Sequence, residues 1–315
     1  MSTVDTARGA AGAGPSLRRR SRPLEIIITA LLVVAATVSV LTTIGIVMSL
    51  VGPTLGFFQE VSFVEFITGG KWTPTFSDKH YGVLPLVVST LLSTAVAITI
   101  AVPLGLGSAI YLAEYASDSA RRTLKPIMEI LAGIPTVVLG FFALNALNPI
   151  LRDIWPGGEP PEFQNLLVAG VVMGIMIVPT IASLSEDAMS AVPRSLREGA
   201  YALASSKRQV AMKVVVPAAI SGIVASFVLG LSRALGETMI VTIAGGLRSD
   251  RVTFDLSEGA ATMTAFIANI GQGDLPVGTL DYDSIFAVGA LLFVFTFVLN
   301  AVSIRMVRKF REVYE

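Results

Sequence analysis

Six long apolar stretches constrain this chain more than any other feature of its sequence. Each is long enough for a transmembrane helix, which needs about 20 mostly apolar residues. Together they predict an all-α polytopic membrane protein, because only helices and closed barrels satisfy their backbone hydrogen bonds within lipid. The six predicted spans are residues 24–50, 83–112, 126–147, 166–188, 215–246 and 284–306.

The composition agrees with a surface that faces lipid. Of the 315 residues, 53% are hydrophobic and 15% are charged, whereas a soluble domain carries about 25% charged residues. The formal net charge is zero, so no global field favours nucleic acid. The chain has no cysteine and a single histidine, His80, so we expect neither a disulfide nor a metal site.

The basic residues predict that both termini are cytoplasmic, since Lys and Arg stay on that side in short loops. With six spans, the cytoplasmic pieces hold 17 of the 23 Lys and Arg residues, counting Arg305 at the cytoplasmic end of the last span, and only Arg233 falls in the interior of a span. We therefore expect a multi-pass protein of a bacterial inner membrane. The five outside residues are Lys71, Lys79, Arg152, Arg248 and Arg251.

The spans divide the chain into further segments. Residues 1–23 are rich in Ala, Gly, Ser and Arg, and we expect them to be disordered in the cytoplasm. The apolar run at 24–50 is much longer than the core of a signal peptide, so it is interpreted as a retained helix. Residues 51–82 form an outside loop, residues 86–306 the transport core, and residues 307–315 a cytoplasmic tail.

Two outside segments are longer than simple hairpins need. The aromatic side chains of residues 51–82 predict either a packed cap or a docking surface. In residues 247–283, helical spacing indicates a short helix that either lies on the outer surface or re-enters the membrane. The residues that share this face are Ala261, Thr264, Ala265 and Ala268.

The cytoplasmic segment 189–217 has features of a docking element. Ser195 and Glu198 have the S-x-x-E spacing of a capping box. In such a box the Ser195 side chain would accept the backbone N–H of Glu198, and the Glu198 side chain would accept the backbone N–H of Ser195. Gly199, Ala200 and Ala204 leave one side of this helix with little bulk. Such a side can enter a groove on another protein.

This segment resembles the EAA loop of type I ABC importer permeases. Glu198, Ala200 and Pro217 match its pattern of a glutamate, small residues and a proline at fixed spacing, while Gly199 and Ala204 are conservative departures from the alanine and the glycine of that pattern. The resemblance implies that these residues dock into a cytoplasmic ATPase. No G-x-x-x-x-G-K-[ST] phosphate loop is found in the sequence, so we expect ATP and Mg²⁺ to bind the partner and this chain to carry no cofactor and no enzymatic activity.

Arg233 and Glu237 are candidate pathway residues within the fifth span. An arginine there costs at least ~2.5–3.5 kcal/mol on insertion scales, so it usually faces a water-filled path or pairs with another charge. At a spacing of four residues, Glu237 would share its helical face. Ser232, Thr238 and Thr242 would add hydroxyl groups. The alternative is an Arg–Glu bridge that only fixes helix packing.

Several strings resemble phosphate-specific transport permeases, and the methionine after RALGET resembles their C-type subunit. These strings are RALGETM, LAGIPTVVLGFFAL, PLGLGSAIYLAEYA and GGKWTPT. The resemblance implies phosphate import together with a paralogous A-type permease, an ATPase dimer and an extracytoplasmic phosphate-binding protein. Two alternatives stay open, an ion-coupled secondary anion transporter, in which Glu237 relays protons, and a phosphate-sensing membrane scaffold.

Three residues are candidates for helix breaks. Gly133 and Pro135 lie in the third span, and Pro179 lies in the fourth. Proline removes a backbone donor and kinks a helix, while glycine lets a neighbouring helix approach closely. The sequence supports gating and ordinary packing equally at these positions.

Overall fold

The computed structural model describes residues 23–273 and 275–309, and it is helical with no strand in these ranges. It contains two compact units, residues 1–49 and residues 50–315. Residues 1–22 of the expected disordered segment and residues 310–315 of the expected tail lie outside the described residues. Residues 307–309, expected in the tail, belong instead to the last helix.

Helix α1 (Pro23–Glu60) is longer than the sequence predicts. We expected the helix to end at residue 50, before Gly52 and Pro53, and to be followed by a loop. The helix instead continues for ten residues, so residues 51–60 of the predicted loop are helical. Packing explains the difference, because Phe57 near the end of α1 is fully buried among aromatic side chains.

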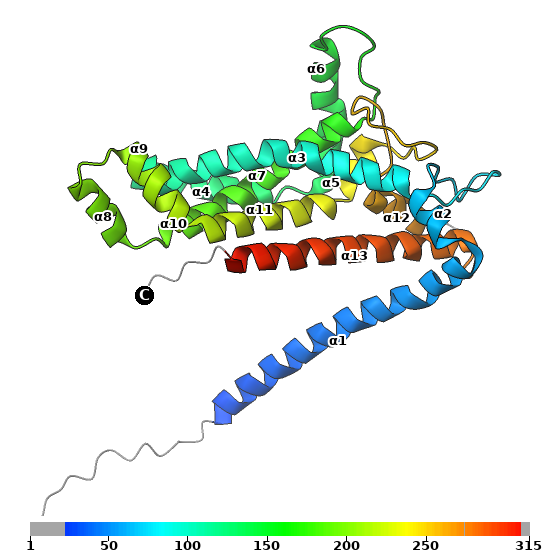
Figure 1. Ribbon diagram of the computed structural model, residues 1–315, viewed down its shortest axis with the longest axis horizontal. Helices are drawn as coiled ribbons and strands as arrows, with labels where there is room; N and C mark the ends of the chain where they lie inside the picture. The colour runs from blue at the N-terminus through cyan, green and yellow to red at the C-terminus, as the bar shows by residue number, and fades with distance from the viewer. Residues whose placement is uncertain (1–22, 274, 310–315) are drawn as a thin grey trace, which may run out of the picture. The chain divides into compact units, whose positions relative to one another are not determined.

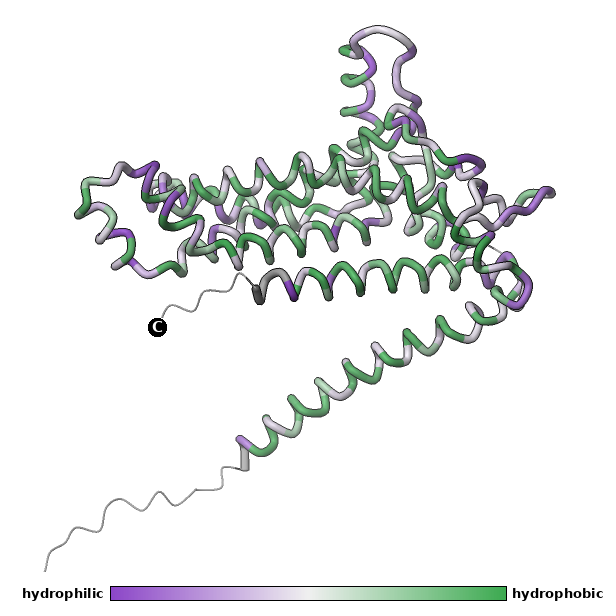
Figure 2. Tube along the Cα trace, in the orientation of Figure 1, coloured by the Kyte–Doolittle hydropathy of each residue, from purple (hydrophilic) through white to green (hydrophobic). Residues whose placement is uncertain are grey.

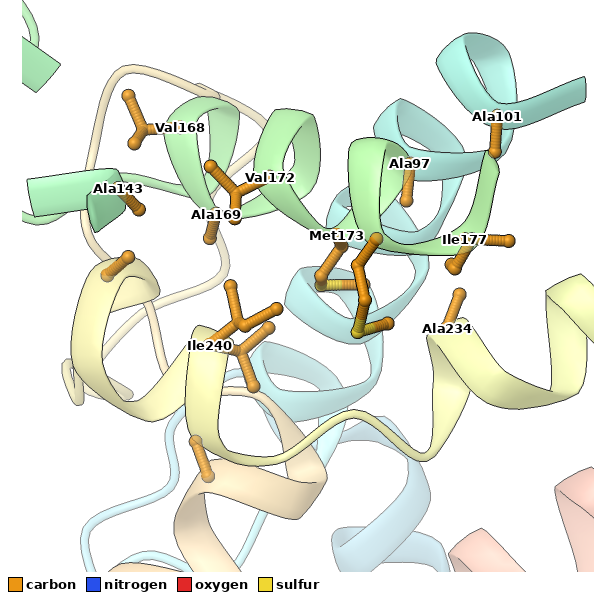
Figure 3. Packing of buried hydrophobic residues seen from close by; sticks show 14 of the residues in the cluster. Ala97, Ala101, Ala143, Val168, Ala169, Val172, Met173, Ile177, Ala234 and Ile240 are labelled. Carbon is orange, nitrogen blue, oxygen red and sulfur yellow. The ribbon is translucent and has the colours of Figure 1, made fainter. Parts of the chain in front are cut away.

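Three helices form the centre of the second unit (Figure 1), namely α3 (Leu84–Ile110), α7 (Leu166–Ser190) and α11 (Ile220–Leu235). Small residues let α3 and α7 approach closely. A Cβ atom on Gly170 would lie 2.6 Å from Val96 Cβ, and one on Gly174 would lie 2.9 Å from the Ala97 carbonyl oxygen. Figure 3 shows the apolar side chains that fill the centre around Met173 and Ile177.

Four described helical stretches are individually long and apolar enough to cross a membrane: Glu25–Glu60, Leu84–Tyr115, Leu166–Ser190 and Leu280–Arg305. The last belongs to α13 (Leu280–Lys309), which packs against α11. Along α1 and α13 the residues are mostly apolar (Figure 2). The count rises to six if each of two bent helix pairs is one span, which is the number that the sequence predicts.

The predicted third span, residues 126–147, is not one straight helix. Helix α4 (Asp118–Ala132) and the following helices α5 (Thr136–Phe142) and α6 (Asn148–Asp153) are bent by 88° at Gly133–Pro135. A π-helical segment, Ala143–Leu147, joins α5 to α6. The bend has a local cause, since Pro135 cannot donate a backbone hydrogen bond to continue α4.

The predicted fifth span, residues 215–246, is broken at two points. The helical stretch that leads into it starts before residue 215 and consists of α9 (Lys207–Val210), a π-helical segment Ala211–Val215 and α10 (Val216–Ala218), which together bend by 71° from α11. The second break follows α11, before the π-helical segment Val241–Gly245. The longest regular helix within the predicted span is therefore Ile220–Leu235.

An aromatic cap covers one end of the unit, as the packed-cap interpretation of residues 51–82 predicts. Trp72 is fully buried and meets the rings of Phe66, Tyr81 and Phe266 edge to face. Helices α2 (Phe63–Thr68) and α12 (Met263–Gly271) supply two of these rings. The α12 helix exists as predicted. Its first four residues, 263–266, are buried in the protein and do not lie on its surface.

Two glycines allow the cap to close. The backbones of Gly69 and Gly82 touch, so a Cβ on Gly69 would lie 2.6 Å from Gly82 Cα, and one on Gly82 would overlap the Gly69 backbone. We predict that Gly82→Ala destabilises the protein by about 1–3 kcal/mol through overpacking. The unfolding midpoint of the purified protein in detergent measures this effect.

Gly107→Ala is the matched control for the cap. Gly107 lies in α3 with no atom near its missing Cβ, so alanine there should raise helix stability by roughly 0.5–1 kcal/mol. A Gly82→Ala protein as stable as the wild type would contradict the close backbone contact.

Glu186 of α7 is fully buried and neutralised by two cations of α4. It forms an ion pair with Arg121, and Lys125 Nζ lies 2.8 Å from its second carboxylate oxygen. Ser190 Oγ also donates to Glu186 at 2.8 Å. Both oxygens of the carboxylate therefore have partners, and the network ties α4 to α7 ahead of the 88° bend.

We predict that the double variant Arg121→Ala/Lys125→Ala loses about 3–5 kcal/mol of stability, because it leaves the Glu186 charge buried without a partner. Arg122→Ala is the matched control, since the Arg122 guanidinium bonds only to the Asp118 carbonyl of its own helix among the described residues. The unfolding midpoint in detergent distinguishes the two. Adding Glu186→Gln to the double variant should restore most of the loss, and a failure to do so would contradict the role of the buried charge.

Candidate functional site

Arg233 lies near the end of α11, half-buried. Its Nη1 atom donates a hydrogen bond to Thr180 Oγ1 of α7 at 3.2 Å. No carboxylate oxygen of the described residues lies within 4.0 Å of its guanidinium nitrogens. A cation that is always charged and has no acidic partner within the described chain is suited to attract an anion.

The predicted shared face of Arg233 and Glu237 is wrong. The α11 helix ends at Leu235, and Gly236 is its C-cap, so Glu237 belongs to the next segment. Its Oε1 atom accepts the backbone N–H groups of Met239 and Ile240 at 3.1 and 3.2 Å. The carboxylate thus caps the start of a new helical turn, because the break leaves those amides without helical partners.

The predicted hydroxyl groups donate to other partners than Arg233. Ser232 Oγ donates to Asn300 Oδ1 of α13 at 2.9 Å. Thr238 Oγ1 donates to the Gly236 carbonyl at 3.3 Å, and Thr242 Oγ1 donates to the Thr238 carbonyl. The sequence pattern missed Thr180 and Asn300, since both are distant in sequence and carry no motif.

The candidate docking residues lie on α8 (Arg194–Ala202) and the turn after it, except for Pro217, which lies in α10. The predicted capping box of Ser195 and Glu198 is absent, because α8 already begins at Arg194 with Pro193 as its N-cap. Ser195 is therefore inside the helix, where its backbone is not in the extended conformation that a cap requires. A capping box forms instead at Ser206 and Gln209, at the start of α9.

Helix α8 is attached to the membrane helices through Arg197. Its Nε atom donates to Glu114 Oε1 at 3.1 Å, in the π-helical segment Tyr111–Tyr115 that ends α3. Its Nη2 atom donates to the Met189 carbonyl of α7 at 2.7 Å. A force applied to α8 would thus reach the ends of α3 and α7 through this one guanidinium as well as through the apolar contacts of α8.

The opposite side of α8 is open. Glu198 is exposed, and no atom lies near the missing Cβ of Gly199. Ala200 packs partly against the core, Pro217 is exposed beyond the loop, and Leu203 after the helix is 84% exposed. Such an apolar side chain beside a flat helix face is suited to bury itself in another protein.

Ala204 has a left-handed backbone, with φ of 59°. It follows the end of α8, where its N–H bonds to the Tyr201 carbonyl and the Ser205 N–H bonds to the Ala200 carbonyl. Glycine is common at such positions because it has no Cβ to clash. Alanine at this position therefore strains the backbone, and glycine would relieve that strain rather than only make room for a partner.

Gly133, Pro135 and Pro179 have different structural roles. Gly133 is the C-cap of α4, and Pro135 precedes α5, so both lie at the 88° bend. Pro179 is buried inside α7, which continues through it as one helix. The break predicted for the third span is present, whereas Pro179 does not interrupt its helix.

A second charged cluster joins two segments that are far apart in the sequence. Arg251 and Arg248 donate to the two oxygens of Glu258 at 2.6 and 3.1 Å. The hydrogen bond from Arg251 holds the pKa of Glu258 below its usual value. Arg248 also lies 3.2 Å from Glu162, so the cluster ties the segment before α7 to the segment after the Val241–Gly245 turn.

We predict that Ala204→Gly stabilises the end of α8 by about 1 kcal/mol, because a left-handed conformation costs an alanine roughly 1–2 kcal/mol. Slower hydrogen exchange of the Ser205 amide measures this effect. Ala202→Gly is the matched control, since the same loss of a methyl group inside α8 should weaken the helix. Faster exchange in Ala204→Gly would contradict the proposed strain.

Comparisons with known proteins agree with this architecture. Residues 101–312 match the family described as "Binding-protein-dependent transport system inner membrane component". The probable ABC transporter permease protein YqgH of Bacillus subtilis is 35% identical over 269 residues, which are 85% of this chain and 84% of the relative. The phosphate transport system permease protein PstC of Mesorhizobium japonicum is 35% identical over 286 residues, which are 85% of this chain and 86% of the relative.

Two solved structures share the fold at low sequence identity. A bacterial alginate ABC transporter, solved in complex with its periplasmic protein, aligns with a TM-score of 0.62 at 16% identity over 92% of this chain and 98% of that chain. The inward-facing MetNI methionine ABC transporter aligns with a TM-score of 0.54 at 22% identity over 73% and 95%. The chain therefore belongs to the inner membrane components of binding-protein-dependent transport systems, with the helical fold of a type I ABC importer permease.

Proposed function

We propose that this chain is the permease subunit of an ATP-driven importer of inorganic phosphate. Its relatives over most of the chain include phosphate transport permeases from several bacteria. The observation in the structure that carries the proposal is Arg233, which has no acidic partner within 4.0 Å among the described residues. Arg233 lies in RALGETM, one of the strings that resemble phosphate-specific transport permeases, so the sequence and the structure support the proposal at the same residue.

Guanidinium chemistry suits this substrate. Its planar fork donates two parallel hydrogen bonds to a tetrahedral oxyanion, and it stays charged at every physiological pH. Because Glu237 caps the following turn, it does not neutralise Arg233 directly. In this proposal Glu237 fixes the chain break beside the pathway, while Ser232 and Thr238 border it.

The fold also supports a set of partners. A paralogous A-type permease would complete the path, and an extracytoplasmic phosphate-binding protein would deliver phosphate to the outer segments. A cytoplasmic ATPase dimer, which binds ATP and Mg²⁺, would dock on α8 through Glu198, Gly199, Ala200, Ala204 and Pro217. With six spans, both termini would then lie on the same side of the membrane as α8 and the ATPase, which is the cytoplasmic side.

Docking at α8 offers a way to couple the two reactions. Closure of the ATPase dimer would move α8, and Arg197 would transmit this movement to α3 and α7 through Glu114 and the Met189 carbonyl. The bend at Gly133 and Pro135 and the proline inside α7, Pro179, are candidate points at which the helices adjust during gating.

The test is phosphate uptake by cells that lack their own high-affinity system and express the complete operon of this chain. We predict that Arg233→Gln reduces uptake at least tenfold, since hydrogen bonds to charged groups contribute roughly 1.5–3 kcal/mol each. Arg233→Lys should retain part of the rate, because it keeps the charge but loses the fork. Arg305→Gln, which removes an exposed arginine of α13, is the matched control.

Membrane levels and co-purification of the ATPase must equal those of the wild type for each variant. Unchanged uptake in Arg233→Gln would remove Arg233 from the pathway and favour a phosphate-sensing scaffold. Uptake that an uncoupler abolishes at constant ATP would favour an ion-coupled secondary transporter instead.

A further inference from the structure

We infer that Thr180 of α7 is part of the anion site, where its hydroxyl group positions the Arg233 guanidinium and donates its own proton to the anion. The inference rests on the proposed function and extends it to a residue that no sequence motif marks. It starts from the 3.2 Å hydrogen bond that joins Arg233 Nη1 to Thr180 Oγ1.

The two residues are held opposite each other by a series of close contacts between α7 and α11. A Cβ on Gly222 would overlap Ala188, so the two helices already touch at that level. The next contact is the buried hydrogen bond between Ser226 and Ser185, at 2.7 Å.

The same series continues toward Arg233. A Cβ on Gly230 would lie 3.0 Å from Ile181 Cδ1 and 3.1 Å from Ile177 Cγ2, so α11 packs directly on α7 there. Gly230 is three residues before Arg233, one turn along the same face. The packing therefore fixes where the Arg233 side chain begins, and Thr180 fixes where one edge of its guanidinium lies.

The Thr180 proton is available for a ligand. Many threonines in the helices of this protein donate to the carbonyl four residues earlier, as Thr90 and Thr99 of α3 do at 2.7 Å. No carbonyl of the described residues accepts a hydrogen bond from Thr180 Oγ1, which acts as an acceptor for Arg233. A hydroxyl group has one donor and two acceptor positions, so the Thr180 proton can point to an oxygen of a bound anion.

This arrangement has a chemical consequence. An arginine side chain has many rotamers, and part of this freedom is lost when it binds a ligand. A partner that holds one N–H in advance reduces that loss and leaves the other N–H groups of the fork for the anion. Thr180 thereby supplies both alignment and one further neutral donor.

The deciding experiment measures phosphate transport and ATP hydrolysis in proteoliposomes that contain the complete assembly and its binding protein. We expect Thr180→Val to lower the maximal transport rate about tenfold while ATP hydrolysis continues, because the isosteric change keeps the helix packing. Thr180→Ser, which retains the hydroxyl, should stay within about twofold of the wild type. Thr99→Val is the matched control, since the Thr99 hydroxyl bonds only within α3 among the described residues.

Each other outcome is decisive. Wild-type transport in Thr180→Val would overturn the inference while leaving the proposed function intact. Equal losses in Thr180→Val and Thr180→Ser would also overturn it, since a loss in the variant that keeps the hydroxyl would assign the effect to the shape and packing of the side chain rather than to its proton. A wild-type assembly that hydrolyses ATP but moves no phosphate would overturn the proposed function, and the inference with it.

Discussion

Close packing of α7 against α3 and α11 is the interaction on which the rest of the second unit depends. The glycines at 170 and 174 bring α3 against one side of α7, and those at 222 and 230 bring α11 against another. In lipid, helices gain little from hydrophobic burial against each other, so close van der Waals contact between small residues is a main source of their association. Enlarging these residues would separate the helices that position Arg233, even though none of the four touches it.

The same constraint explains why the broken helices end as they do. Backbone groups released by a break cannot bond to lipid, so side chains or neighbouring segments must satisfy them. After α11, the Glu237 carboxylate takes two of these amides, and Thr264 of α12 donates to the Glu237 carbonyl at 2.7 Å. The break beside Arg233 is thus stabilised by hydrogen bonds to both the side chain and the carbonyl group of Glu237.

The sequence predicted what depends on composition and local pattern. Apolar length predicted the helical membrane fold, and the residues of the predicted docking helix do form α8. It failed where tertiary contacts overrode local rules. Periodicity placed Glu237 on the face of Arg233, but Gly236 ends the helix between them. The S-x-x-E pattern placed the N-cap at Ser195, but Pro193 is the N-cap of that helix. Thr180 and Glu186 were not found, because only folding brings their partners to them.

The separation of Arg233 from Glu237 affects how strongly the proposed site would bind an anion and how the anion would be released. A carboxylate beside the guanidinium would weaken the attraction for every anion at all stages of transport. With Glu237 engaged by backbone amides, only the neutral hydroxyl of Thr180 contacts the guanidinium among the described residues. If Arg233 binds the anion as proposed, no ion pair of the described residues competes for its guanidinium, and a change in the distance between α7 and α11 is one way to release the anion. Because Arg197 joins α8 to the Met189 carbonyl of α7, a movement of α8 would reach one of the two helices that hold the hydrogen bond between Arg233 and Thr180.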